Sequence, residues 1–218
     1  MNTSKQTEFL KFLKLLNDND IIEDVILVGS WAEFLYFKNG ILPAENADEF
    51  KTLDIDFLLE NLRKPTPPKN LLALAKSEGY LIESDILTGT TKLLGERLEI
   101  EFLISKRGAG FENTLKTNLG VTAQALRHLE MLLEYPVTTK YLCYDVTIPL
   151  PEAYVVHKMI INPERGSKSR KDIRAIENLI PYLDIEKITE ITQKLHKKDL
   201  RRVEQFIQEN SLIKEYFL

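Results

Sequence analysis

Two aspartates, Asp54 and Asp56, alternate with apolar residues in the run Thr52–Leu59. In a strand the side chains of residues i and i+2 point to the same face, so these carboxylates should lie side by side. Two carboxylates that close repel each other unless a cation lies between them or one of them is protonated. Mg²⁺ prefers such oxygen ligands. The spacing predicts a magnesium site, although an Asp-x-Asp pair taken alone is more often an exposed sheet face.

A third acidic group is available on a later predicted strand, Leu98–Ile104, in which Glu99 and Glu101 also share one face. Alone, these two glutamates would be a solvated face. The strand pattern leaves open which of them would join Asp54 and Asp56.

The dipeptide Gly29-Ser30 follows a β-branched run and precedes a predicted helix. At such a turn the missing side chain lets backbone N–H groups approach a phosphate, and the helix N-terminus favours negative charge. The Ser30 hydroxyl can add a hydrogen bond. A lone Gly-Ser is usually only a turn, but together with the acidic strands it predicts a site for a nucleoside triphosphate and one or two metal ions.

The apolar pattern predicts the elements that position these groups. The predicted strands are Val25–Val28, Thr52–Leu59, Tyr80–Glu83, Thr91–Leu94 and Leu98–Ile104, with a hairpin of Val137–Cys143 and Val146–Ile148 turning at Tyr144-Asp145. The predicted helices are Lys5–Leu16, Trp31–Phe37, Lys69–Glu78, Thr122–Leu133, Glu152–Ile161, Lys168–Tyr182, Ile185–His196 and Lys198–Glu209. We expect an α+β fold: a mixed β-sheet with flanking helices over residues 1–150, followed by a helical C-terminal domain over residues 151–218.

The order of Gly-Ser turn, helix, Asp-x-Asp and later acidic strand resembles the DNA polymerase β-like nucleotidyltransferase superfamily. The stretch Lys51–Phe57 looks like the Arg-x-Thr-x-Asp-Ile-Asp variant of bacterial members related to abortive-infection toxin components, with Lys51 in place of the Arg. Four further blocks look like an uncharacterised bacterial nucleotidyltransferase family, namely Leu98–Leu103, Gly120–Arg127, Pro151–Lys158 and Lys168–Asp172.

The resemblance implies transfer of a nucleoside monophosphate from a nucleoside triphosphate to a hydroxyl acceptor, with pyrophosphate leaving. Two Mg²⁺ ions would take part, one holding the triphosphate and one lowering the pKa of the attacking hydroxyl. Asp54 and Asp56 would be the shared catalytic metal ligands. Glu101 would be the third carboxylate, because its Glu-Phe-Leu triplet looks most like the family, and Glu99 is the alternative. Gly29-Ser30 would bind the triphosphate.

Cations of the C-terminal part are the next candidates, because helices from that part commonly cover the nucleotide in this superfamily. Lys158, Arg170 and Lys171 would offset the triphosphate charge; the alternative is a solvated helical face. Asp172 is expected to pair with a nearby cation. We interpret His157 as a hydrogen-bonded helix residue rather than a catalytic base.

The composition excludes some classes of protein and of metal site. The net charge is −4, which argues against a constitutive binder of nucleic-acid backbone. It divides unevenly: residues 1–150 carry 16 Lys+Arg and 22 Asp+Glu, whereas residues 151–218 carry 13 and 11. An acidic part facing a slightly basic part suits a magnesium–triphosphate site. The single cysteine, Cys143, cannot form an internal disulfide, and three scattered histidines cannot complete a Cys/His zinc site.

The sequence predicts no membrane span and no secretory signal, so we expect a cytoplasmic protein. The acceptor stays open among a small molecule, a protein hydroxyl and a tRNA end. A toxin-like member that modifies tRNA or protein, and an inactive module that binds a nucleotide or a partner, are the alternatives to a general nucleotidyltransferase. The complete acidic set favours catalysis, and no pattern indicates the oligomeric state.

Overall fold

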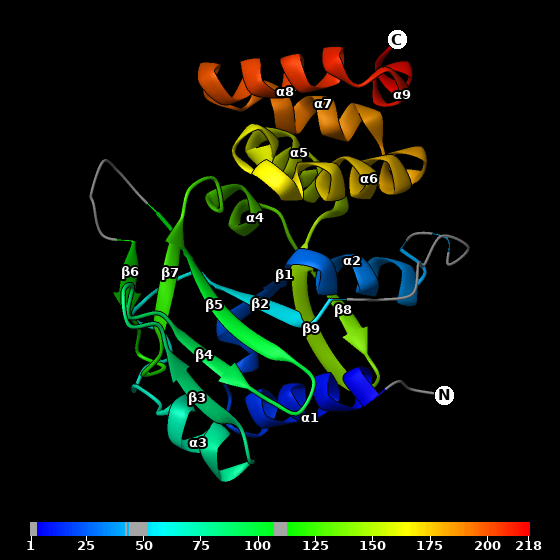
Figure 1. Cartoon of the computed structure of the whole chain (residues 1–218). Coiled ribbons are helices and arrows are strands. Elements are labelled where there is room, and N and C mark those ends of the chain that lie inside the picture. Colours follow the sequence, from blue (N-terminus) through cyan, green and yellow to red (C-terminus); the bar gives the residue numbers. More distant parts are fainter. Residues whose placement is uncertain (1–3, 42, 44–51, 107–112) are drawn as a thin grey trace.

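A mixed β-sheet forms the centre of the N-terminal part in the computed structural model, which describes residues 4–41, 43, 52–106 and 113–218 (Figure 1). Its strands are β1 (Val25–Val28), β2 (Asp54–Leu59), β3 (Leu81–Ser84), β4 (Thr91–Leu94), β5 (Glu99–Ser105), β6 (Thr114–Lys116) and β7 (Thr122–Leu126). The strand order is β1-β2-β5-β4-β3, and β7 pairs with β5 and β6. β2 and β5 are parallel neighbours, so the two acidic strands run side by side in the same direction.

Helices and a separate hairpin surround this sheet. The N-terminal helices are α1 (Ser4–Asp18), α2 (Gly29–Lys38), α3 (Leu71–Ser77) and α4 (Glu130–Glu134). The hairpin consists of β8 (Pro136–Tyr141) and β9 (Tyr144–Pro149), and β9 lies beside β1. The C-terminal helices are α5 (Pro151–Ile161), α6 (Ser169–Leu179), α7 (Ile185–Gln193), α8 (Lys197–Glu209) and α9 (Ser211–Lys214). Two short 3-10 turns, Asn162–Glu164 and Gly166–Lys168, connect α5 to α6.

Alternation along the strands separates two apolar clusters, one on each face of the sheet. In β2, Ile55 and Phe57 belong to the large cluster, whereas Leu58 belongs to the small one. Asp54 and Asp56 therefore lie on the same face as Leu58. The small cluster is completed by Leu103 of β5 and by residues of the α4 region, so the acidic face of the sheet is the one that α4 covers.

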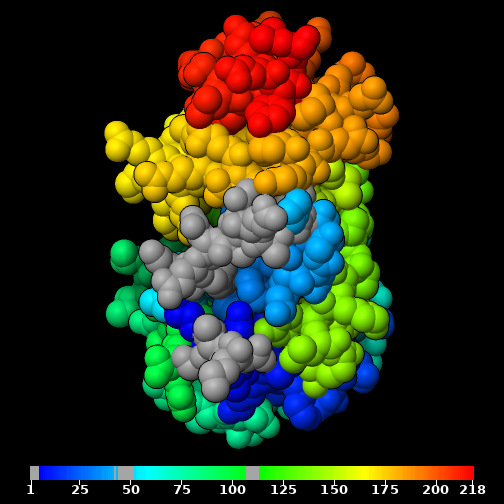
Figure 2. All heavy atoms as spheres, turned by 90° about the vertical axis from the view of Figure 1, so that its right-hand side faces the viewer, coloured from blue at the N-terminus to red at the C-terminus, as the bar shows by residue number. Residues whose placement is uncertain are grey.

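The C-terminal helices stack on one end of the sheet-containing part (Figure 1), and the same layering is visible in the space-filling view (Figure 2). α5 packs against α4, α6, α7 and α8. The large apolar cluster continues from α1 into these helices, with Ile176, Ile188 and Val203 among its buried members. This arrangement holds the start of α5 next to α2 and the acidic strands.

Most predicted elements agree with the structure, but the helix predicted over Thr122–Leu133 is wrong. Residues Thr122–Leu126 form β7, which pairs with β5 and β6, and a helix begins only at Glu130. The apolar residues at helical spacing are divided between the strand and the short α4. His128 lies between them at φ +67°, a conformation that ends regular structure. Pairing with β5 thus overrides the local pattern.

The hairpin turn also differs from the prediction. Tyr141 pairs with Tyr144, so the turn consists of Leu142 and Cys143 rather than Tyr144-Asp145. The strand β6 was not predicted. Residues 107–112 and residues 44–51, which include Lys51, lie outside the described residues. In the described part of the chain, each helix is too short or too polar to cross a bilayer.

Candidate active site

The register of the two acidic strands brings Asp56 next to Glu101. Asp54 pairs with Glu99 and Asp56 pairs with Glu101 across the parallel β2–β5 ladder. Asp54, Asp56 and Glu101 line one cavity, whereas Glu99 does not line it. The register gives each glutamate an aspartate neighbour, and the lining of the cavity favours Glu101 as the partner of the aspartates.

Gly29 begins α2 and lies directly against Asp56. Its φ is +69°, in the left-handed region that favours glycine, and a Cβ atom there would come within 2.6 Å of the Asp56 Oδ2 atom. Glycine is thus required both by the backbone and by the neighbouring carboxylate. Ser30, the second residue of α2, is partly buried and does not line the cavity.

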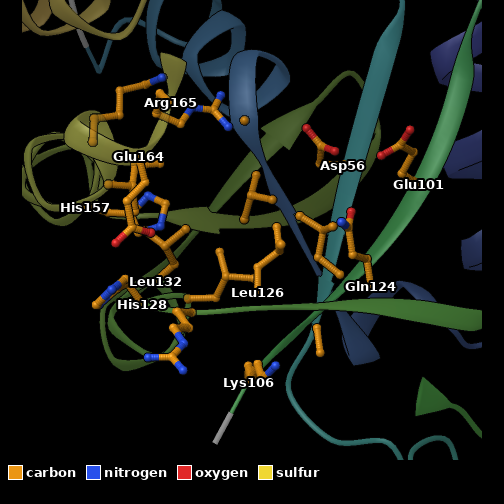
Figure 3. A pocket seen from close by; sticks show the side chains of 18 of the residues that line it. Asp56, Glu101, Lys106, Gln124, Leu126, His128, Leu132, His157, Glu164 and Arg165 are labelled. Carbon is orange, nitrogen blue, oxygen red and sulfur yellow. The ribbon is translucent and has the colours of Figure 1, made fainter. Parts of the chain in front are cut away.

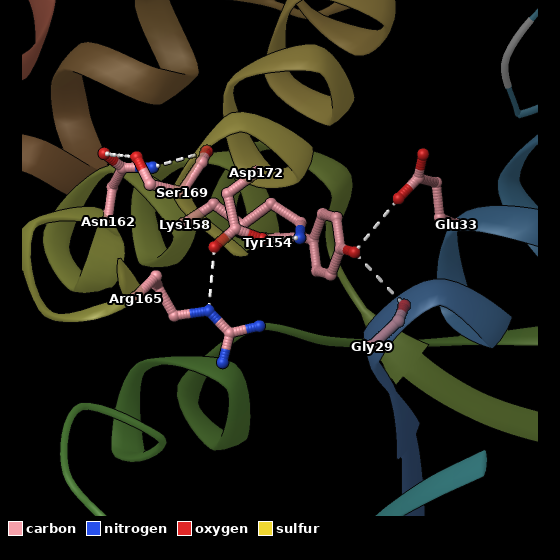
Figure 4. A network of polar contacts seen from close by, with 8 residues as sticks. All are labelled: Gly29, Glu33, Tyr154, Lys158, Asn162, Arg165, Ser169 and Asp172. Carbon is pink, nitrogen blue, oxygen red and sulfur yellow. Dashed lines mark hydrogen bonds and ion pairs between the residues drawn. The ribbon is translucent and has the colours of Figure 1, made fainter. Parts of the chain in front are cut away.

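Tyr154 of α5 ties the C-terminal part to this turn (Figure 4). Its hydroxyl donates a hydrogen bond to the Gly29 carbonyl oxygen (3.2 Å) or to the Glu33 carboxylate (3.1 Å), both of which lie within reach. Burial raises the pKa of the Glu33 carboxyl, while Lys158 and the Tyr154 hydroxyl oppose that shift. The start of α2 is therefore fixed in position by a side chain that comes from far along the sequence.

The carboxylates repel one another in this site. Burial, followed by the charges of Glu101 and Asp54, raises the pKa of Asp56 from 3.8 to about 6. Lys168 and Arg165 oppose that shift. Desolvation and like charge both disfavour the ionised form of an acid, so the site has a deficit of positive charge that a bound cation would offset.

Lys92 of β4 already neutralises one member of the set. Its Nζ atom forms an ion pair with Glu101 and lies 3.6 Å from Glu99 Oε2. The hydrogen bond to Glu101 is the main cause of a raised Lys92 pKa. Lys92 therefore compensates Glu101, and the uncompensated charge is concentrated on Asp56 and Asp54.

The donor set suits a magnesium ion that also binds a substrate. In the described residues, no group of three or more His, Cys, Asp or Glu side chains is arranged to hold a metal ion by itself. Mg²⁺ is usually bound by one or two carboxylates together with substrate phosphates rather than by a complete protein cage. Asp54 and Asp56, with their excess negative charge, fit that requirement.

Lys158 lines the cavity, but its ammonium is already paired with another side chain (Figure 4). It is buried, and its Nζ atom lies 2.7 Å from Asp172 Oδ1 and 4.9 Å from the centre of the Tyr154 ring. Arg165 binds the other oxygen, with its Nε atom 2.8 Å from Asp172 Oδ2. The prediction that Asp172 pairs with a nearby cation is confirmed, because its side chain is only 1% exposed and binds two cations.

Of the three predicted cations, Lys158 lines the cavity and the other two do not. Arg170 and Lys171 are exposed on α6 and do not line it, whereas Arg165 and Lys168 do. Sequence reasoning missed Arg165, Lys168 and Lys92 as site residues. The cluster of basic residues after α5 could have indicated cations near the site. It could not show that 3-10 turns place Arg165 and Lys168 at the cavity.

The cavity is about 630 Å³ in volume, and its two ends differ in chemistry (Figure 3). Asp56 and Glu101 lie at one end, and His157, His128 and Leu132 lie at the other. A volume of this size is typical of a small-molecule site. The geometry can therefore hold an elongated anionic ligand with its charged part at the acidic strands.

Comparison with known proteins identifies the family and the fold. The model of a family described as nucleotidyltransferase matches residues 7–198. A crystal structure of an antigenic nucleotidyltransferase-like protein from Paracoccidioides brasiliensis superposes with a TM-score of 0.62 at 13% identity, covering 97% of this chain and 91% of that one. That likeness shows a shared α+β fold.

A second solved structure, a tRNA nucleotidyltransferase complexed with a primer tRNA and an incoming ATP analogue, gives a TM-score of only 0.24 at 14% identity. It covers 88% of this chain and 55% of that one. No curated protein matches the sequence. The family match spans most of the chain and includes every acidic residue of the site, so the chain belongs to this nucleotidyltransferase family.

Proposed function

We propose that this protein uses Mg²⁺ to transfer a nucleoside monophosphate from a nucleoside triphosphate to a hydroxyl acceptor, releasing pyrophosphate. One observation carries the proposal. Asp56 lies beside Glu101 and against Gly29 at the start of α2, in a cavity that Arg165 and Lys168 also line.

Each part of the site would have a different role, which follows from its position. The start of α2, which carries no side chain at Gly29, would accept a phosphate next to the acidic strands. Asp54 and Asp56 would hold Mg²⁺ together with the triphosphate, and the ion would supply charge compensation at the reacting phosphate. Arg165 and Lys168 would offset the remaining triphosphate charge.

Glu101 has a separate role in this proposal. It is adjacent to Asp56 and is held in place by Lys92. A carboxylate at that position would take up the proton of the attacking hydroxyl as the acceptor oxygen bonds to the α-phosphorus and pyrophosphate leaves. The assignment gives the glutamate a task that the two aspartates do not perform.

The test is a transfer assay with an unidentified acceptor. The protein is incubated with each of the four α-³²P-labelled nucleoside triphosphates, Mg²⁺ and a cell extract, and labelled products are separated. The expected result is an Mg²⁺-dependent product that disappears with Asp54→Asn/Asp56→Asn and persists with Glu99→Gln, the neighbouring carboxylate outside the cavity. Equal labelling by wild type and the double variant would refute the proposal.

The same assay separates the acceptor classes. Loss of the labelled product on ribonuclease treatment would identify a tRNA or other RNA acceptor, and loss on protease treatment would identify a protein. Resistance to both would identify a small molecule. A toxin-like member would be one whose labelled product is tRNA or protein and whose expression stops growth.

A specific contact favours the inactive alternative. The ion pair between Lys92 and Glu101 already neutralises the third carboxylate. A nucleotide-binding module without catalysis would bind the triphosphate but give no labelled product with any extract.

A further inference from the structure

The cavity continues beyond the acidic strands into an end with apolar walls. This end has apolar walls of Leu126, Leu129, Leu132 and Ile161, and the side chains of His157, His128 and Glu164 line it as well. In Figure 3, Leu126 lies between the acidic end and the end that holds His157 and Leu132. A metal and a triphosphate would account for the acidic end only, because the apolar walls offer no charge to either and Glu164 is already paired with Arg202.

His157 is the unusual member of the apolar end. It belongs to α5, it is 8% exposed, and its Nε2 atom is buried without a hydrogen-bond partner in the described part of the chain. The expectation of a hydrogen-bonded helix residue is therefore wrong at this atom. A buried polar atom without a partner destabilises a fold, and such defects in native proteins call for an explanation.

The surroundings keep the His157 ring neutral. Burial, followed by the charges of Lys158 and His128, lowers its pKa to about 3, and Asp172 only partly opposes this. A neutral imidazole carries one N–H donor and one acceptor nitrogen. The cavity therefore contains a ring that can form directional hydrogen bonds but adds no charge.

A nucleobase matches this environment. It has two apolar faces, which suit the leucine and isoleucine walls, and a polar edge, which suits a neutral imidazole. The base is also the uncharged part of a nucleoside triphosphate, so it does not need to lie beside the metal, Arg165 or Lys168. A triphosphate at the acidic end would direct the base along the cavity toward His157.

We propose that the nucleobase of the triphosphate binds in this apolar end and that His157 contacts the edge of the base and determines which base is preferred. The inference rests on the proposed function, since it requires the triphosphate to bind at the acidic end. It deepens that function by naming the residue that selects the substrate.

The experiment measures binding rather than turnover. Dissociation constants are determined by calorimetry for the four non-hydrolysable nucleoside triphosphates with Mg²⁺, and for tripolyphosphate with Mg²⁺ as a probe that lacks a base. The proteins are wild type, His157→Leu, His157→Gln and the matched control His196→Asn, which changes an exposed histidine outside this cavity. Melting temperatures of the unliganded proteins are measured in parallel.

For His157→Leu we expect two changes of opposite sign. The melting temperature rises, because an unpartnered buried polar atom is removed. The affinity for the preferred nucleotide falls about two- to tenfold, as for the loss of one hydrogen bond, and the four nucleotides become nearly equal. Tripolyphosphate affinity stays at the wild-type value, His157→Gln keeps part of the base preference, and His196→Asn matches wild type in binding.

Each other outcome is informative. An unchanged base preference in both His157 variants, or an equal loss for nucleotide and tripolyphosphate, would overturn this inference and leave the proposed function standing. If wild type binds neither probe, the proposed function and this inference both fail. If His157→Leu does not fold, the base preference of His157→Gln decides.

Discussion

Replacing Gly29 by alanine should strain the backbone and also displace the Asp56 carboxylate, and the two effects can be measured separately as lost stability and lost transfer. At φ +69° an alanine is strained by about 1–2 kcal/mol, and its Cβ would lie 2.6 Å from Asp56 Oδ2. The carboxylate would have to move by roughly 1 Å to reach ordinary contact distance. Misplacement of a catalytic group by that amount costs about 100-fold in rate.

Gly40 provides the matched control for this experiment. Its φ is +67°, but a Cβ there would meet no atom of the described residues within 4 Å. We expect Gly29→Ala and Gly40→Ala to lose a similar free energy of unfolding, about 1–2 kcal/mol, in urea titrations. Transfer of label from an α-labelled nucleotide should fall about 100-fold in Gly29→Ala and stay near wild type in Gly40→Ala.

The comparison has a clear refuting result. If Gly29→Ala transfers label as well as Gly40→Ala does, the close approach of α2 to Asp56 has no role in the reaction. If Gly29→Ala is inactive because it is unfolded, its urea curve will show that directly.

Three further predictions concern charge. Asp172→Asn leaves the buried Lys158 without its partner and should cost about 3–5 kcal/mol of unfolding free energy in urea, and a loss below about 1 kcal/mol would contradict the ion-pair assignment. Because the pKa of Asp56 is raised to about 6, folding takes up a proton between about pH 4 and pH 6, and the ionised carboxylate destabilises the fold above that range. Without metal, Asp56→Asn should therefore have a free energy of unfolding up to about 3 kcal/mol higher than wild type at pH 7, and the difference should vanish near pH 4. If the variant and wild type are equally stable at pH 7, the Asp56 carboxylate does not carry this penalty. Lys92→Met removes the ion-pair partner of Glu101 and should lower the Mg²⁺ concentration needed for half-maximal transfer. The free energy of unfolding should change by less than about 1 kcal/mol. A higher Mg²⁺ requirement would show instead that Lys92 supports the active arrangement.

The residues that do chemistry could be recognised from sequence because their spacing follows a local rule. Alternation in β2 indicated that Asp54 and Asp56 share a face, and the structure places both in one cavity. The choice between Glu99 and Glu101 could not be made that way. It depends on which glutamate lines the cavity, and the cavity is formed by elements far apart in the sequence, which no local pattern encodes.

The errors have a similar physical origin. The spacing of Ala125 and Leu129 indicates a helix, but pairing with β5 makes the first of these residues part of a strand. Arg165 and Lys168 reach the cavity because short 3-10 turns interrupt the helical region. The missing partner of His157 Nε2 depends on which atoms of other elements surround it, so it became visible only in three dimensions.

The most direct measurement of the proposed reaction follows both ends of the triphosphate, in parallel reactions with one label each. Wild type and Asp56→Asn are incubated with Mg²⁺, a cell extract and the preferred nucleotide, labelled in separate reactions at the α- or the γ-phosphate. The account predicts that the α-label moves to the acceptor while the γ-label appears in pyrophosphate, both only with wild type. Transfer of the γ-label to the acceptor, or equal transfer by Asp56→Asn, would contradict it.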